Sequence, residues 1–198
     1  VITLRPVLME EPTDNGRAYS VESWFNSPRV DMYSRLTSYN KFLELMIKAG
    51  LYDTKAYQFT FLTEGELYSV FVPSDQALED YRADTLSKQD LISFIKYHFV
   101  KGDLIFTDGK KPSGQYETLR LDETSTQFLT KYSLLNVRTG TDVIEILDNS
   151  GNPYIRIEED ENSSNIFIAT DTDNTSTSPY DFITTGVIHE IDKVLIKK

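Results

Sequence analysis

The chain has 198 residues, of which 39% are hydrophobic and 26% are charged, and its formal net charge is −11. A chain of this length can bury a sizeable core without disulfides or metals, which suits one globular domain. The acidic excess opposes binding to phosphate backbones and anionic lipid headgroups, so we expect no nucleic-acid partner. The absence of cysteine excludes thiolate metal sites and a cysteine nucleophile. No apolar run reaches the ~18 residues of a membrane span, so we expect no direct membrane insertion.

Residues 1–30 are predicted to contain two short strands, "VITLRPVL" and "RAYSVESWF", joined by the polar turn "EEPTDNG". The segment 15–25, "NGRAYSVESWF", aligns without gaps with residues 185–195, "TGVIHEIDKVL". Two interpretations stay open: an N-terminal hairpin, or the end of a preceding, similar domain. Because the chain begins with Val1 and not Met, an export signal or lipid anchor upstream would not be visible.

Helical periodicity is found in the first half of the chain. In "YNKFLELMIKAGLYD" (39–53), apolar residues recur at helical spacing and Gly50 stands where a C-terminal cap belongs. "LYSVFVPSDQAL" (67–78) predicts a strand that ends at Pro73, followed by a helix capped by Ser74. "LSKQDLISFIKYHFVKGDL" (86–104) predicts a longer helix with its exit at Gly102.

The second half of the chain is predicted to consist of β-strands. The apolar runs are "YSLLNVRT", "DVIEILD", "PYIRIEE", "SNIFIAT" and "GVIHEIDKVLIK", separated by polar turns. Helices early and antiparallel strands late predict an α+β domain with a β-sandwich, on which several short helices pack.

Three blocks, in the same order, resemble the signatures of the fasciclin domain family. They are "YSVFVPSDQAL", "LISFIKYHFVKGDL" and "PYDFITTGVIHEIDKVLIKK", and the similarity extends over about residues 33–198. For the second block the resemblance implies a helix that ends in the Tyr97-His98 pair, followed by a Gly turn and a strand. The resemblance implies a fasciclin-like domain, in the form of a β-sandwich or wedge, over residues 31–198. It assigns these signature residues a structural or adhesion role: Pro73, Ser74, Asp75, Tyr97, His98, Asp181, Gly186, His189 and Asp192.

Departures from the family pattern limit what the resemblance carries over. "YQFTFLTEGELY" (57–68) is an inserted or elongated segment, and the stretch before the closing signature is long. In the position of the Asp-Ile pair of some animal members, this chain has Asp181 and Phe182. This difference weakens any transfer of integrin recognition.

The two histidines, His98 and His189, are the first candidates for chemistry. They could form a polar switch near neutral pH or part of an adhesion epitope. The packing interpretation is favoured: His98 falls on the apolar face of its predicted helix, and His189 lies among aliphatic residues of a strand. We expect removal of either ring to reduce stability.

No catalytic or metal-binding constellation accompanies these histidines. The chain lacks G-x-S-x-G, a Gly-rich phosphate loop and a paired-histidine helix motif, so we expect no enzymatic activity and no cofactor. The acidic stretches "EEDEN" (158–162) and "DTDN" (171–174) lack the spacing of a calcium loop and are interpreted as solvated loops.

Alternating aromatic residues mark a possible binding loop. Tyr57, Phe59 and Phe61 lie in the inserted segment, where they could form an exposed strand or simply an additional sheet strand. The resemblance implies a non-catalytic adhesion or interaction module, with an extracellular protein or glycan as partner. It also implies a location outside the cell or on the cell envelope, with a surface lipoprotein as the expected form. The alternative hypothesis is a surface protein that binds a carbohydrate or another small ligand.

Overall fold

The computed structural model describes residues 4–6, 19–21, 35–63, 65–158, 166–168 and 186–197. The main sheet consists of β5 (Tyr68–Pro73), β6 (Phe99–Lys101), β7 (Gly114–Leu121), β8 (Tyr132–Gly140), β9 (Val143–Leu147), β10 (Pro153–Glu158), β11 (Ile166–Ile168) and β12 (Gly186–Ile191). Its strand order is β10-β9-β8-β7-β6-β5-β12-β11. The α+β class predicted from the sequence is confirmed.

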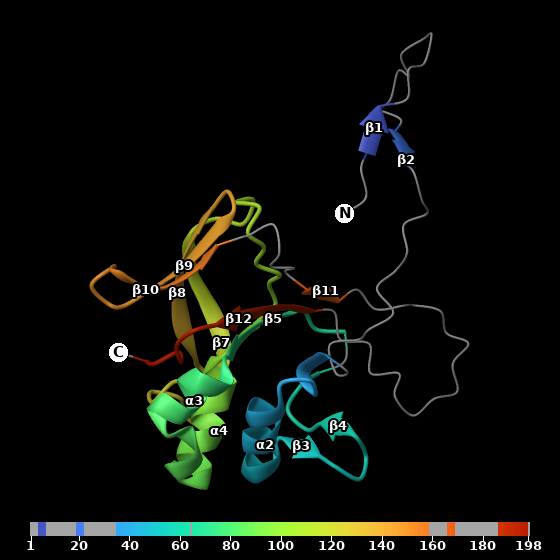
Figure 1. Cartoon of the computed structure of the whole chain (residues 1–198). Coiled ribbons are helices and arrows are strands. Elements are labelled where there is room, and N and C mark those ends of the chain that lie inside the picture. Colours follow the sequence, from blue (N-terminus) through green and yellow to red (C-terminus); the bar gives the residue numbers. More distant parts are fainter. Residues whose placement is uncertain are drawn as a thin grey trace.

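Three α-helices gather at one end of the strands: α2 (Asn40–Ala49), α3 (Asp75–Tyr81) and α4 (Lys88–Tyr97) (Figure 1). A 3-10 helix, η1 (Ala83–Thr85), connects α3 to α4. Two short antiparallel pairs complete the described elements: β1 (Leu4–Pro6) with β2 (Tyr19–Val21), and β3 (Tyr52–Asp53) with β4 (Gln58–Phe59). The predicted N-terminal strands are thus present, and their origin in a preceding domain stays a prediction.

The ends of the helices follow local sequence signals. Gly50 closes α2 in the left-handed conformation with φ 76°, as its position predicts. At the start of α4, the Ser87 hydroxyl oxygen accepts a hydrogen bond from the Asp90 N–H (3.2 Å) and donates one to the Asp90 carboxylate (2.6 Å). Ser87 and Asp90 therefore cap this helix together, as the spacing predicts.

The helical pattern alone predicts that α4 continues to Gly102, which is wrong, whereas the helix end at the Tyr97-His98 pair that the family resemblance implies is confirmed. The helix ends at Tyr97, and residues 99–101 form β6, which pairs antiparallel with β5. Phe99 and Val100 are both fully buried, so an extended backbone places them on opposite faces of a covered strand. A helix at this position would bury only one of the two side chains. Pairing with β5 therefore determines the conformation of residues 99–101, although their sequence continues the helical pattern.

Two further features of the sheet differ from the predictions. The closing strand β12 pairs parallel with β5 and antiparallel with β11, whereas the late strands were expected to be antiparallel. Alternation shows which residues share a face but carries no information about strand direction. The strand β7 was not predicted, because its apolar and polar residues do not alternate: the buried face includes Thr118, and the exposed face includes both Glu117 and Leu121.

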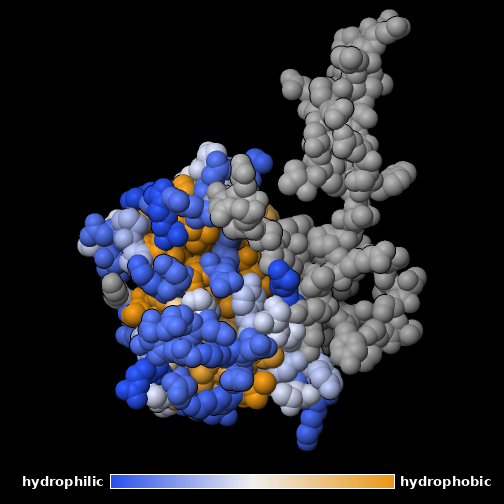
Figure 2. Space-filling view, viewed as in Figure 1, coloured by the Kyte–Doolittle hydropathy of each residue, from blue (hydrophilic) through white to orange (hydrophobic). Residues whose placement is uncertain are grey.

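The central strand β5 is buried along its whole length and separates two apolar clusters. Val70 and Val72 pack with residues of α2 and α4 in the first cluster. Phe71 belongs to the second cluster, together with buried residues of β7, β8 and β9. On the outside, hydrophilic residues cover most of the face seen in Figure 2, with apolar residues between them.

Candidate functional site

His98 is fully buried at the C-terminal end of α4 and bonds only to backbone groups in the described structure. Its Nε2 accepts a hydrogen bond from the Leu195 N–H at 3.0 Å, so Nδ1 carries the proton and donates to the Phe94 carbonyl at 2.9 Å. Burial lowers the pKa of His98 to about 4. The ring is therefore neutral at neutral pH and connects the end of α4 to the C-terminal segment.

His189 occupies the centre of β12 with 2% of its surface exposed. Its Nε2–H donates to the Ile105 carbonyl at 2.8 Å, and its ring stacks on Phe71 with 5.4 Å between the centroids. Burial also lowers the pKa of His189 to about 4. The proton therefore lies on Nδ1 in His98 and on Nε2 in His189. In each ring, a backbone hydrogen-bond partner determines which nitrogen carries the proton.

Ser69 completes the attachment of the loop that His189 contacts. This fully buried hydroxyl donates to the Asp103 carbonyl at 2.7 Å and accepts from the Ile105 N–H at 2.8 Å. Sequence reasoning missed Ser69, although a small polar residue in the apolar strand "LYSVFVP" was a signal. Together, Ser69 and His189 hold residues 103–105 against β5 and β12.

The first signature acts at the junction of strand and helix. Pro73 ends β5 opposite Ile191, and the Ser74 N–H donates to the Ile191 carbonyl at 2.8 Å. The Ser74 hydroxyl oxygen accepts from the Ala77 N–H at 3.2 Å and caps α3, as predicted. Asp75 follows in the first turn, where a carboxylate suits the positive end of the helix dipole.

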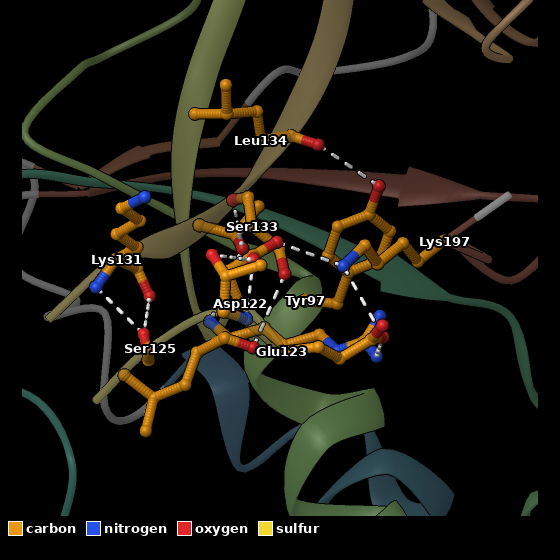
Figure 3. Close-up of polar contacts among 12 residues, drawn as sticks. Tyr97, Asp122, Glu123, Ser125, Lys131, Ser133, Leu134 and Lys197 are labelled. Carbon is orange, nitrogen blue, oxygen red and sulfur yellow. Dashed lines mark hydrogen bonds and ion pairs between the residues drawn. The ribbon is translucent and has the colours of Figure 1, made fainter.

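The remaining signature residues differ in their surroundings. Tyr97 is 6% exposed, and its hydroxyl donates to the Leu134 carbonyl of β8 at 3.3 Å (Figure 3). Gly186 begins β12, opposite Tyr68 of β5, and Asp192 is exposed just after this strand. Asp181 lies outside the described residues.

The three aromatic residues of the predicted binding loop divide between surface and core. Tyr57 is 53% exposed, whereas Phe59 and Phe61 are half-buried and pack against the first apolar cluster. The Phe61 ring meets Phe99 edge-on at 5.0 Å. A binding role in this segment stays a prediction, and its exposed part is Tyr57.

A different aromatic residue, Phe128, is the most exposed large apolar side chain among the described residues, at 90%. It lies in the loop 122–131 between β7 and β8, with Leu129 beside it at 55%. The loop is held by its own hydrogen bonds: Thr126 and Leu129 exchange backbone bonds of 2.9 and 3.2 Å, and the Ser125 hydroxyl accepts from the Lys131 N–H at 2.8 Å (Figure 3). Sequence reasoning did not single out Phe128.

Asp122 fixes the start of this loop. One carboxylate oxygen accepts from the backbone N–H and the hydroxyl of Thr124 at 2.9 and 2.8 Å, and the other accepts from Lys197 at 3.1 Å. These bonds, with the backbone N–H of Thr124 as the largest contribution, hold the pKa of Asp122 well below its usual range. The loop is thereby connected to the C-terminal segment.

A cavity of about 320 Å³ adjoins this loop, between the helices and the C-terminal segment. Aromatic and cationic side chains line it together with Asp90 and Ser93: Tyr81, Phe94, Tyr97, Arg120 and Lys197. The Arg120 guanidinium lies over the Tyr97 ring at 5.7 Å from the centroid. The cavity therefore combines flat apolar surface with positive charge.

Metal-binding geometry is not found within the described ranges, where no three His, Asp or Glu side chains come together. The acidic stretch 171–174 and residues 159–162 lie outside the described residues. Among the helices that the structure describes, none has the length and apolar character to cross a membrane.

These features define an α+β domain whose signature histidines serve as buried connections between backbone segments. The Fasciclin domain profile matches residues 37–197, which is most of the chain, and the chain belongs to the fasciclin domain family. Domains of this family are generally cell-adhesion and protein-interaction modules, and many members are extracellular or surface proteins. No curated protein matches the chain.

Proposed function

We propose that this domain is a non-catalytic adhesion module outside the cell or on the cell envelope, and that it binds a protein partner through the loop 122–131. The observation that carries this proposal is the 90% exposure of Phe128 in a loop stabilised by its own hydrogen bonds. Membership in the fasciclin family supports the class of function and the location. Both histidines, which could have offered chemistry, are committed to backbone partners.

The physical argument concerns what an exposed aromatic ring can supply. Burial of a Phe side chain in a partner's apolar pocket contributes about 2–3 kcal/mol, whereas in water the ring contributes nothing to the fold. Because the loop is already ordered by bonds such as that between Ser125 and Lys131, little conformational entropy is lost on binding. A rigid loop with an aromatic tip is typical of the residues that dominate binding energy at interfaces.

The test is biolayer interferometry with the immobilised domain against a panel of purified extracellular matrix and cell-surface proteins. We expect saturable binding to a panel member, with affinity reduced at least about tenfold by Phe128→Ala. The control is Ile47→Ala, which removes another exposed apolar side chain (41%) from α2 and leaves the loop intact. An affinity that Phe128→Ala leaves unchanged, or a panel without a binder, would contradict the proposal.

A second candidate function, carbohydrate binding, is favoured by the cavity beside α4. Tyr81 lines this cavity and keeps 38% of its surface exposed, although its ring stacks on Phe94. An aromatic ring with one covered and one open face is the surface on which the C–H groups of a sugar ring pack. Adhesion through Phe128 does not require this feature.

A further inference from the structure

The loop 122–131 is joined to other elements by side chains at its start. In the described part of the chain, the hydrogen bonds of residues 124–131 all stay within the loop. Asp122 and Glu123 reach beyond it, to Lys197 of the C-terminal segment and, from Glu123, to Arg120 of β7. The orientation of the loop, and of Phe128 at its tip, therefore depends on these few contacts.

Lys197 provides the contact from the more distant part of the sequence. Its Nζ lies 3.1 Å from a carboxylate oxygen of Asp122 and 3.4 Å from one of Glu123 (Figure 3). The side chains of Lys197 and Asp122 are only 29% and 25% exposed, whereas Glu123 is 75% exposed, so water screens the Asp122 pair less. Arg120 belongs to β7, which runs directly into the loop. The Lys197–Asp122 pair is therefore the stronger polar link between the loop and an element other than its own hairpin.

The C-terminal segment that carries Lys197 is itself held in place. The Leu195 N–H donates to Nε2 of the buried His98 at 3.0 Å, and Leu195 and Val194 are 1% and 7% exposed. Lys197 follows Leu195 by two residues, which is at most about 7 Å of extended chain. Its backbone therefore has a fixed position close to the loop, and its ammonium group can hold the Asp122 carboxylate at one place.

We propose that Lys197 is a positioning residue of the loop 122–131, and that its bond to Asp122 holds Phe128 in the orientation that binds the partner. The proposal rests on the proposed adhesion function and adds that the C-terminal segment controls the affinity of that loop. A partly exposed ion pair contributes little to the free energy of unfolding. Without it, the loop samples other orientations, and ordering the loop again on binding reduces the affinity.

The variant Lys197→Gln tests the proposal by NMR relaxation and by biolayer interferometry. We expect backbone ¹⁵N order parameters of about 0.85 for residues 124–131 in the natural sequence, and of about 0.6 or less in the variant. The affinity for the panel protein that the natural sequence binds should fall about tenfold, with little change in melting temperature. Lys197→Arg retains a cation at this position and should restore both the order parameters and the affinity.

Lys193→Gln is the matched control. It removes the same charge from the same segment, but the Lys193 Nζ donates to the Tyr154 carbonyl at 3.3 Å and not to the loop. Order parameters and affinity should therefore stay at the values of the natural sequence. Equal losses in Lys193→Gln and Lys197→Gln would overturn the specific role of Lys197.

A double-variant cycle separates positioning from direct contact with the partner. If Lys197 acts through Phe128, Lys197→Gln weakens binding much less in the Phe128→Ala background than in the natural sequence. Equal losses in the two backgrounds, or an affinity that Lys197→Gln leaves unchanged, would overturn the proposal. Unchanged order parameters would also overturn it, whether or not a panel protein binds. A panel without a binder contradicts the adhesion function alone, because the order parameters still decide whether Lys197 holds the loop.

Discussion

Two regions of the molecule use side-chain hydrogen bonds to order the backbone: the interior around His98 and His189, and the surface loop 122–131. The first region is buried, whereas the second exposes an aromatic side chain to solvent. In the interior, two imidazoles and Ser69 supply hydrogen bonds to backbone groups that are buried away from water. In the loop, local hydrogen bonds hold a backbone that lifts Phe128 into solvent at 90% exposure. The signature residues His98 and His189 belong to the first region, so they report on the fold, and we attribute binding to the second.

The largest expected effect is a loss of stability in mild acid, caused by the interior. The pKa of each histidine is lowered from 6.5 to about 4 in the folded state, so between these values the unfolded chain binds more protons. The contribution of the two neutral histidines to the free energy of unfolding is therefore fully present well above pH 6.5. It decreases as the pH falls toward 4. By pH 5 we expect a loss of about 2 kcal/mol for each histidine.

Urea denaturation at pH 7, 6 and 5 measures this loss. Most carboxylates of an unfolded chain titrate below pH 5, so the change above that value comes mainly from the histidines. The double variant His98→Gln, His189→Gln is the control, because it has no imidazole to protonate and should show a much flatter profile. Equal free energies of unfolding for the natural sequence at pH 7 and pH 5 would contradict the prediction that protonation of the buried histidines destabilises the interior.

The next effect in size is that of His98→Ala. The substitution leaves the Leu195 N–H and the Phe94 carbonyl without their imidazole partner and opens a cavity, so we expect a loss of about 3 kcal/mol. Chemical denaturation at neutral pH measures it. Gln89→Ala on the exposed face of the same helix is the control and should change stability by less than about 0.5 kcal/mol. Similar stabilities of the two variants would show that His98 does not hold the interior together.

Ser74→Ala is expected to have a smaller effect, because it removes only the cap of α3. The Ala77 N–H loses its hydroxyl acceptor, which costs about 1 kcal/mol. Ser74→Asp retains an acceptor at the same position and should preserve stability, as thermal denaturation of both variants would reveal. A loss in Ser74→Asp equal to that in Ser74→Ala would refute the capping role.

The smallest expected effect on stability belongs to the loop. Phe128 is 90% exposed, so Phe128→Ala should change the free energy of unfolding by no more than about 0.5 kcal/mol. Urea denaturation beside the natural sequence provides the measurement. A loss of several kcal/mol would mean that the ring belongs to the core, and the contrast between the two regions would fail.

The helix positions and helix caps that depend on nearby residues were predicted correctly from the sequence. The apolar spacing in α2, the glycine at its end and the caps at Ser74 and Ser87 each depend on neighbours within four residues, and the structure confirms them. The helical pattern alone placed the end of α4 too late, because the pairing of β6 with β5 is a contact between distant segments. The parallel direction of β12 depends on such contacts as well.

The candidate site was harder to predict than the fold. Both histidines were identified and interpreted as packing residues, but their partners, Leu195 and Ile105, lie 97 and 84 residues away in the sequence. Phe128 has no distinguishing pattern, since its exposure results from the loop that follows β7. The cavity draws Tyr81, Arg120 and Lys197 from separate elements, which no single motif contains.

The most direct test of the central claim, that the signature histidines are neutral structural connections, is imidazole ¹⁵N–¹H NMR during a pH titration. Because the chain has two histidines, their signals can be assigned with one variant each. We predict an Nδ1–H ring for His98, an Nε2–H ring for His189, and a pKa of about 4 for both. Titration of either ring near 6.5, its ordinary value, would contradict the role of that histidine as a neutral, buried connection.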